Sequence, residues 1–140
     1  TEPLKEKKIK VVLCEPGKVA RVAEIGTELS DLQRVVGGLI EPYYPFEEQV
    51  CIVCNDEGKY NGMRPCRAIY GENREMMDII FGPFFICDCS TPYFGSLNKE
   101  QLERYTKQFQ NPERFFRAGG EIKAVPYKPE KDHGADGGYY

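Results

Sequence analysis

The chain has 140 residues, of which 41% are hydrophobic, and a formal net charge of −3. This length and composition predict a single globular domain with a hydrophobic core, and the excess of acidic over basic side chains argues against nucleic-acid binding, which needs a concentrated basic surface. No apolar stretch approaches the roughly 20 residues of a membrane span, so we expect a cytoplasmic protein that does not associate with membranes.

Five segments have the apolar, β-branched or alternating pattern of β-strands. Two of them flank the turn signal Glu15-Pro16-Gly17, which predicts a hairpin at the start of the domain. A Gly82-Pro83 pair precedes the most aromatic segment, which we expect to form a central strand. The predicted strands are 9–13, 19–25, 39–44, 49–54 and 84–87.

Two further segments predict helices. Thr27 is a suitable cap for a helix over 28–36, which has apolar residues on one face and ends at Gly37-Gly38. Ser96 or Asn98 begins the second helix, which extends to Gln108. The sequence thus predicts an α+β fold, a mostly antiparallel sheet of about five strands with two principal helices packed on one face.

The remaining segments have weaker patterns. The expected elements are a short strand at 68–70, a strand or helix at 76–81 and a last strand at 121–127. Phe115 and Phe116 are expected to dock on the core. Both ends of the chain are rich in charges, proline and glycine, so we expect flexible tails at 1–8 and 128–140 around one domain of residues 9–127.

Six cysteines raise the question of a metal or redox site. Cys51 and Cys54 form a CxxC pair, and Cys87 and Cys89 form a CxC pair. The residues between Cys51 and Cys54 favour extended backbone, which points side chains three apart to opposite faces, so neither a zinc knuckle nor a thioredoxin-like pair fits. We expect buried, reduced thiols, no metal and no cofactor.

No arrangement of residues in the sequence dictates a reaction. The single histidine, His133, lies in the glycine-rich tail, where nothing would orient it as a base. The carboxylates Glu41, Asp56, Glu57 and Asp88 could serve as acids or bases, but no spacing pairs them. We therefore predict that the protein is not an enzyme.

A polar turn after the strand at 49–54 is the candidate binding site. An ordinary solvated hairpin tip is one interpretation, and a recognition surface in which Arg67 pairs with Glu57 is the other. Exposed tyrosines would add to such a surface, because they supply contact area at low entropy cost. The candidate residues are Asn55, Asp56, Glu57, Lys59, Arg64 and Arg67.

Several short motifs resemble an uncharacterised family catalogued as domain of unknown function 3846. They are Ile9-Lys10-Val11-Val12 with Glu15-Pro16-Gly17, then Val36-Gly37-Gly38 followed by Ile40-Glu41, and then Asn55-x-Glu57-Gly58-Lys59 with Arg67. The resemblance covers about residues 9–109. Members of the family occur in gut bacteria, phages and mobile elements, and the family supplies no activity, cofactor or catalytic residue. It implies an accessory protein of mobile DNA.

The sequence prediction is a small non-enzymatic interaction protein that binds another protein. Two alternatives remain open. One is an inhibitor of a host defence system, of the anti-restriction or anti-CRISPR type. The other is a carboxylate-dependent hydrolase, which would need a concave pocket with a carboxylate of raised pKa.

Overall fold

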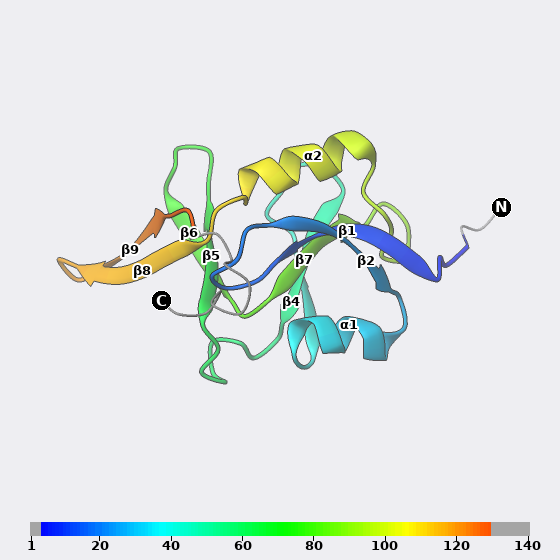
Figure 1. Ribbon diagram of the computed structural model, residues 1–140, viewed down its shortest axis with the longest axis horizontal. Coiled ribbons are helices and arrows are strands. Elements are labelled where there is room, and N and C mark those ends of the chain that lie inside the picture. Colours follow the sequence, from blue (N-terminus) through cyan, green and yellow to red (C-terminus); the bar gives the residue numbers. More distant parts are fainter. Residues whose placement is uncertain (1–3, 130–140) are drawn as a thin grey trace.

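The computed structural model describes residues 4–129, and it has the predicted α+β architecture (Figure 1). A five-stranded antiparallel sheet is accompanied by two helices and two separate hairpins. The elements are β1 (Lys8–Cys14), β2 (Arg21–Gly26), α1 (Leu29–Val36), β3 (Ile40–Tyr43), β4 (Val50–Asn55), β5 (Pro65–Tyr70), β6 (Met76–Phe81), β7 (Phe84–Asp88), α2 (Lys99–Gln108), β8 (Glu113–Ala118) and β9 (Glu121–Pro126).

The main sheet has the strand order β2-β1-β7-β4-β3, and it contains the five strands predicted from the sequence. β4 and β7 lie next to each other at the centre, with Ile52 opposite Ile86. Every residue of β4 is buried. A strand that is apolar on both faces needs cover on both faces, so this sheet requires two protecting layers.

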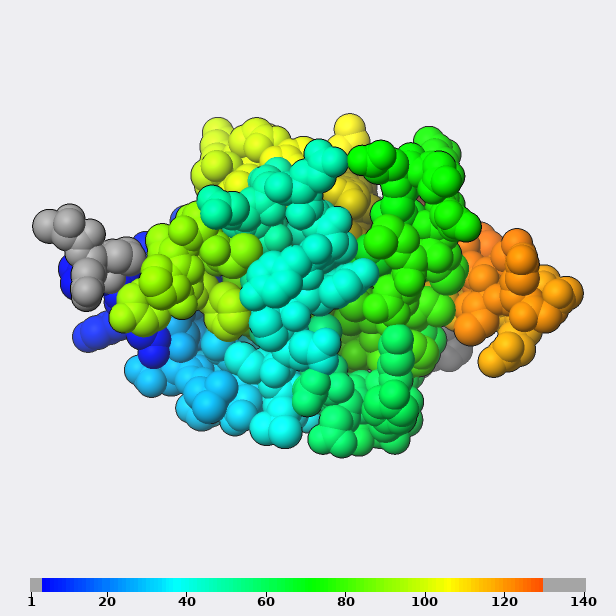
Figure 2. Space-filling model, turned by 180° about the vertical axis from the view of Figure 1, so that it is seen from behind, coloured from blue at the N-terminus to red at the C-terminus, as the bar shows by residue number. Residues whose placement is uncertain are grey.

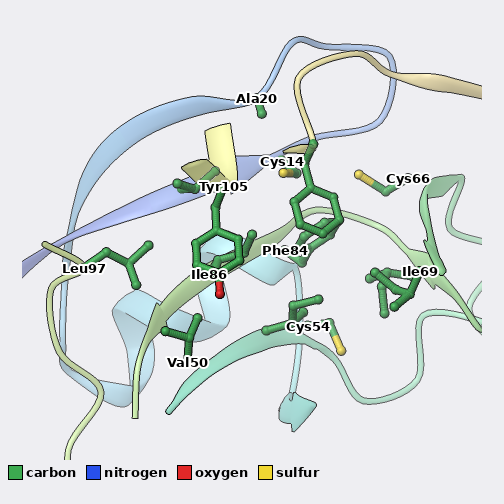
Figure 3. Packing of buried hydrophobic residues seen from close by; sticks show 14 residues of the cluster. Cys14, Ala20, Val50, Cys54, Cys66, Ile69, Phe84, Ile86, Leu97 and Tyr105 are labelled. Carbon is green, nitrogen blue, oxygen red and sulfur yellow. The ribbon is translucent and has the colours of Figure 1, made fainter. Parts of the chain in front are cut away.

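The two helices cover opposite faces of the sheet, which corrects the prediction that both pack on one face. Leu32 and Val36 of α1 pack with one set of strand residues that includes Val53 and Phe85. Tyr105 and the following Phe109 pack on the other face with the alternate set (Figure 3). Helical periodicity shows which face of a helix is apolar but not which face of a sheet receives it, and this explains the error.

The helix ends confirm one predicted cap and correct another. Asn98 caps α2 through its side chain, which accepts from the Gln101 amide at 2.8 Å. Thr27 does not cap α1, because its hydroxyl donates to the carbonyl of Glu6, and Glu28 is the N-cap residue. Gly37 ends α1 in the left-handed conformation with φ 81°, as the double glycine predicted.

Two hairpins lie outside the main sheet. The β5–β6 hairpin contributes Cys66, Ile69 and Ile80 to the core on the α2 side. The β8–β9 hairpin projects from the side of the molecule (Figures 1 and 2). Phe116 in β8 is 48% exposed, so the prediction that it docks on the core is wrong.

All six cysteines are free thiols, and five of them are buried. Cys51 and Cys54 face opposite sides of β4, as predicted from extended backbone. Neither helix in the described part of the chain has the length and apolar content to cross a membrane. The predicted tail residues 1–3 and 130–140, with His133, lie outside the described residues.

Candidate functional site

A small hollow lies where the β3–β4 edge of the main sheet meets the β5–β6 hairpin. Its volume is about 220 Å³. We call it the acidic hollow, because three of the side chains that line it are carboxylates. The polar lining residues are Glu41, Tyr43, Asn55, Asp56, Lys59, Tyr60 and Asp78.

The register of β3 and β4 brings two carboxylates together. Glu41 lies opposite Cys54, which is two residues before Asp56. The amide of Asp56 donates to the carbonyl of Leu39 at 2.8 Å and so extends this ladder by one step. Glu41 and Asp56 consequently line the same hollow, although 15 positions separate them in the sequence.

Asn55 fixes the start of the turn that forms one wall of the hollow. Its side-chain oxygen accepts from the Glu57 amide at 2.8 Å, and its Nδ2 donates to the Val36 carbonyl at 3.1 Å, which ties the turn to the end of α1. Gly38 makes room for this contact, because a Cβ atom at that position would lie 2.8 Å from Nδ2. Asn55 is thus buried as a structural residue.

Gly58 and Lys59 attach the same turn to β6. A Cβ atom on Gly58 would lie 2.7 Å from the carbonyl oxygen of Phe81, so only glycine permits this approach. The Lys59 ammonium donates to the Asp78 carboxylate at 2.9 Å. The motifs around Gly37-Gly38 and Gly58-Lys59, which carried the sequence resemblance, therefore meet at the acidic hollow.

The acidic hollow holds more negative than positive charge. The neighbouring Asp56 carboxyl, followed by some desolvation and the charges of Asp56 and Asp78, raises the pKa of Glu41 above its usual 4.5. Lys59 acts in the opposite direction on Glu41. The hydrogen bond to Asp78 raises the pKa of Lys59, so this ammonium is charged and already paired with Asp78. A cation from outside would relieve the remaining repulsion.

The chemistry of the hollow favours binding over nucleophilic attack. Burial, with the charges of nearby carboxylates, raises the pKa of the Cys54 thiol to about 12, so the thiolate is scarce at neutral pH. Among residues 4–129, no three His, Cys, Asp or Glu side chains are placed to hold a metal ion. The groups that can act here are carboxylates, one ammonium and two phenols.

The structure brings only part of the predicted site together. Asn55, Asp56 and Lys59 line the acidic hollow, and Glu57 is exposed on the same turn. Arg64 lies elsewhere, with its guanidinium 3.3 Å from the position that a Cβ on Gly17 would take.

Arg67 is buried, which corrects the hypothesis that it pairs with Glu57 on the surface. Its side chain is 1% exposed and donates to backbone carbonyls: Nε to Phe109 at 3.0 Å, NH1 to Cys66 at 3.0 Å and NH2 to Lys18 at 2.7 Å. Phe109 ends α2, where the helix dipole is negative, so a cation is favoured at this point. Arg67 therefore joins β5 to α2 and to the β1–β2 turn.

Asp78 is the residue that the sequence prediction missed. It is the only charged side chain in β6, whose sequence is MMDIIF. A lone carboxylate in an apolar strand needs a partner or access to water, and this was a signal for a site. Because the pattern of residues 76–81 fits either a strand or a helix, the sequence does not predict the pairing of Asp78 with Lys59.

Comparison with known proteins identifies a family but no activity. A family model described as Domain of unknown function (DUF3846) matches residues 9–110. No curated protein and no solved structure gives a significant match to the chain. The match includes the acidic hollow and α2 and ends before β8.

Proposed function

Since the chain belongs to this family, which has no assigned activity, we propose a role from its own surface: it is a small interaction protein that binds another protein at the acidic hollow. The observation that carries the proposal is the lining of the hollow, where three carboxylates face a single ammonium that is already bonded to Asp78. A Lys or Arg side chain of a partner would supply the missing charge. Charge complementarity of this kind gives specificity and fast association.

The surroundings of the hollow suit a protein partner. Tyr60 is 86% exposed at its rim, and Tyr43 is half-buried within it. Tyrosine is enriched at protein interfaces because it combines an apolar ring with a polar tip. The volume of about 220 Å³ is below the range of roughly 300–1,000 Å³ that holds most small-molecule ligands. It can admit the end of one long side chain.

Charge reversal at the rim tests this proposal. Asp56→Lys should abolish capture of the partner from the cells in which the protein occurs, because it places a cation where the partner's cation would bind. Glu103→Lys makes the same charge change on an exposed position of α2 and should leave capture unchanged. Both variants should unfold near the wild-type temperature. Equal capture by all three proteins would place the interface elsewhere.

A second candidate is an inhibitor of a host defence system, encoded in a phage or mobile element. An acidic surface favours this role, because the nucleic-acid site of a nuclease is basic and an acidic protein could occupy it. Expression of the protein should then rescue invading plasmid or phage DNA in a defended host, and Asp56→Lys should remove the rescue. An interaction protein without this role would give no rescue in any host.

A third candidate is a carboxylate-dependent hydrolase, and the Glu41 and Asp56 pair is the observation in its favour. Two adjacent carboxyl groups, one of them with a raised pKa, are the arrangement of many acid and base pairs. The hollow is small and both carboxyls are exposed, which ranks this candidate below protein binding. Turnover of esters, glycosides or phosphoesters that Glu41→Gln abolishes would move it to first place.

A further inference from the structure

Two thiols of the central strands lie against each other in the core. Cys51 of β4 and Cys87 of β7 are opposite each other in the antiparallel ladder, and their Sγ atoms are 3.8 Å apart. Both side chains are fully buried on the α1 face of the sheet. The contact arises from strand pairing across 36 positions of the chain, and the CxxC spacing of Cys51 with Cys54 plays no part in it.

A third thiol connects this pair to the surface. Cys89 follows β7, and its N–H donates to the Gln49 carbonyl at 3.0 Å, so the ladder continues to this residue. Cys89 is therefore on the same face of the sheet as Cys87 and diagonal to Cys51. It packs against the same cluster as the buried pair, and it is the one partly exposed thiol of the six. Cys89 is thus the thiol of this group that a reagent from solvent meets first.

The three thiols favour ionisation of the central one. The neighbouring Cys87 thiol lowers the pKa of Cys51, burial opposes this effect, and the Cys89 thiol lowers the pKa further. The Cys51 thiol and burial raise the pKa of Cys87, and burial raises that of Cys89 to about 11. Cys51 is therefore the thiol that ionises first, and the thiolate is the form that attacks a disulfide.

We propose that Cys51, Cys87 and Cys89 form a disulfide-exchange site, at which a small external disulfide such as glutathione disulfide oxidises Cys51 and Cys87 to a disulfide. Opposed residues of an antiparallel ladder have Cα atoms about 4.5–5.5 Å apart, within the roughly 4.4–6.8 Å that a disulfide spans. Rotation about the two Cα–Cβ bonds brings the sulfurs together. None of the three residues lines the acidic hollow, so this proposal and the proposed function stand or fall separately.

The oxidation takes three thiol–disulfide exchanges. The Cys89 thiolate attacks the external disulfide, forms a mixed disulfide and releases one external thiolate. The Cys51 thiolate attacks the Cys89 sulfur and releases the second external thiolate. Diagonal residues have Cα atoms about 7–8 Å apart, so this bond is strained, and Cys87 displaces Cys89 from it.

These steps balance in electrons and protons. Cys51 and Cys87 are oxidised to the disulfide, and the external disulfide is reduced to two thiols. The two thiols take up the protons that Cys51 and Cys87 lose. Cys89 returns to its reduced form and acts only as the point of entry.

Peptide mapping after oxidation tests the site. The purified folded chain is held in excess glutathione disulfide, its free thiols are blocked with N-ethylmaleimide, and the unreduced digest is analysed by mass spectrometry. The expected product has one disulfide, between Cys51 and Cys87, and four blocked thiols. It should unfold at a higher temperature than the reduced chain, because the bond closes a loop across the central strands. An unmodified chain, a glutathione adduct on Cys89 without an internal disulfide, or a disulfide between other cysteines would overturn the proposal.

Replacement of Cys89 tests the point of entry. Cys89→Ser should form the same disulfide about tenfold more slowly or less, because the external disulfide loses its partly exposed partner. Cys54→Ser is the matched control, since it removes a thiol of β4 that faces the other side of the sheet, and it should oxidise at the wild-type rate. Equal rates for the wild type and Cys89→Ser would overturn the assignment of Cys89.

Discussion

Replacing Arg67 should destabilise the whole domain. Its guanidinium donates hydrogen bonds to β5, to the end of α2 and to the β1–β2 turn. Among the hydrogen bonds of residues 4–129, no other side chain joins these three elements. Arg67→Ala would leave the Phe109, Cys66 and Lys18 carbonyls without these donors. The expected result is a large loss of stability with no direct effect on the acidic hollow.

The number of hydrogen bonds and the charge of the donor determine the expected loss of stability. Three bonds of 3.0, 3.0 and 2.7 Å join a cation to buried or half-buried carbonyls. Bonds to charged groups contribute about 1.5–3 kcal/mol each. Removal of the guanidinium also removes the cost of burying it, so the net loss should be about 3–5 kcal/mol. A domain of this size has about 5–15 kcal/mol in total, so the variant should lose a large share of its stability.

Urea unfolding followed by circular dichroism measures this loss. Arg67→Lys retains the charge but cannot reach three carbonyls, so it should fall between Arg67→Ala and the wild type. Arg64→Ala is the matched control, because Arg64 is exposed and should change stability by about 0.5 kcal/mol or less. A loss below about 1 kcal/mol for Arg67→Ala would refute the structural role of the guanidinium.

Three further predictions concern the hollow and the thiols. Gly38→Ala should destabilise the domain by about 1–3 kcal/mol in urea unfolding, because its Cβ would collide with the Asn55 amide, and an unchanged midpoint would contradict this. The raised pKa of Glu41 means that the folded state binds the carboxyl proton more tightly than the unfolded state does. Protonated Glu41 therefore stabilises the fold below pH 4.5, and this contribution to stability is lost as the pH rises through the folded pKa. Glu41→Gln should therefore gain stability over the wild type as the pH rises from 4 to 7, and a constant difference would contradict the raised pKa of Glu41. A thiol reagent should label only Cys89 in the folded protein, slowly because its pKa is raised to about 11, and all six thiols in urea.

The sequence predicted the strands of the main sheet because their residues are locally informative. β-branched and aromatic runs, turn residues and the double glycine after α1 act within a few positions of one another. The placement of α2 on the opposite face depends on contacts far apart in the chain. The uninterrupted apolar run of β4 already indicated cover on both faces, and more weight on that run would have corrected the prediction.

The candidate site was predicted in part for the same reason. Asp56 and Lys59 lie in a turn that the sequence marks as polar, whereas Glu41 and Asp78 reach the hollow only through strand pairing and through the docking of the β5–β6 hairpin. The sequence hypothesis paired Arg67 with Glu57 on the surface, whereas the structure buries it, which is unusual for arginine. Its burial depends on backbone carbonyls of α2 and of the β1–β2 turn. These residues are far from Arg67 in the sequence, so no local sequence pattern predicts the contacts.

Site-specific photo-cross-linking from Tyr60 tests the central claim most directly. A benzophenone side chain at this exposed rim position should give one discrete adduct in the cells where the protein occurs, and Asp56→Lys should remove that adduct. The same side chain at Tyr93, which is exposed on another part of the surface, should not form it. An adduct that survives Asp56→Lys, or one that forms equally from Tyr93, would contradict the assignment of the acidic hollow as a protein-binding site.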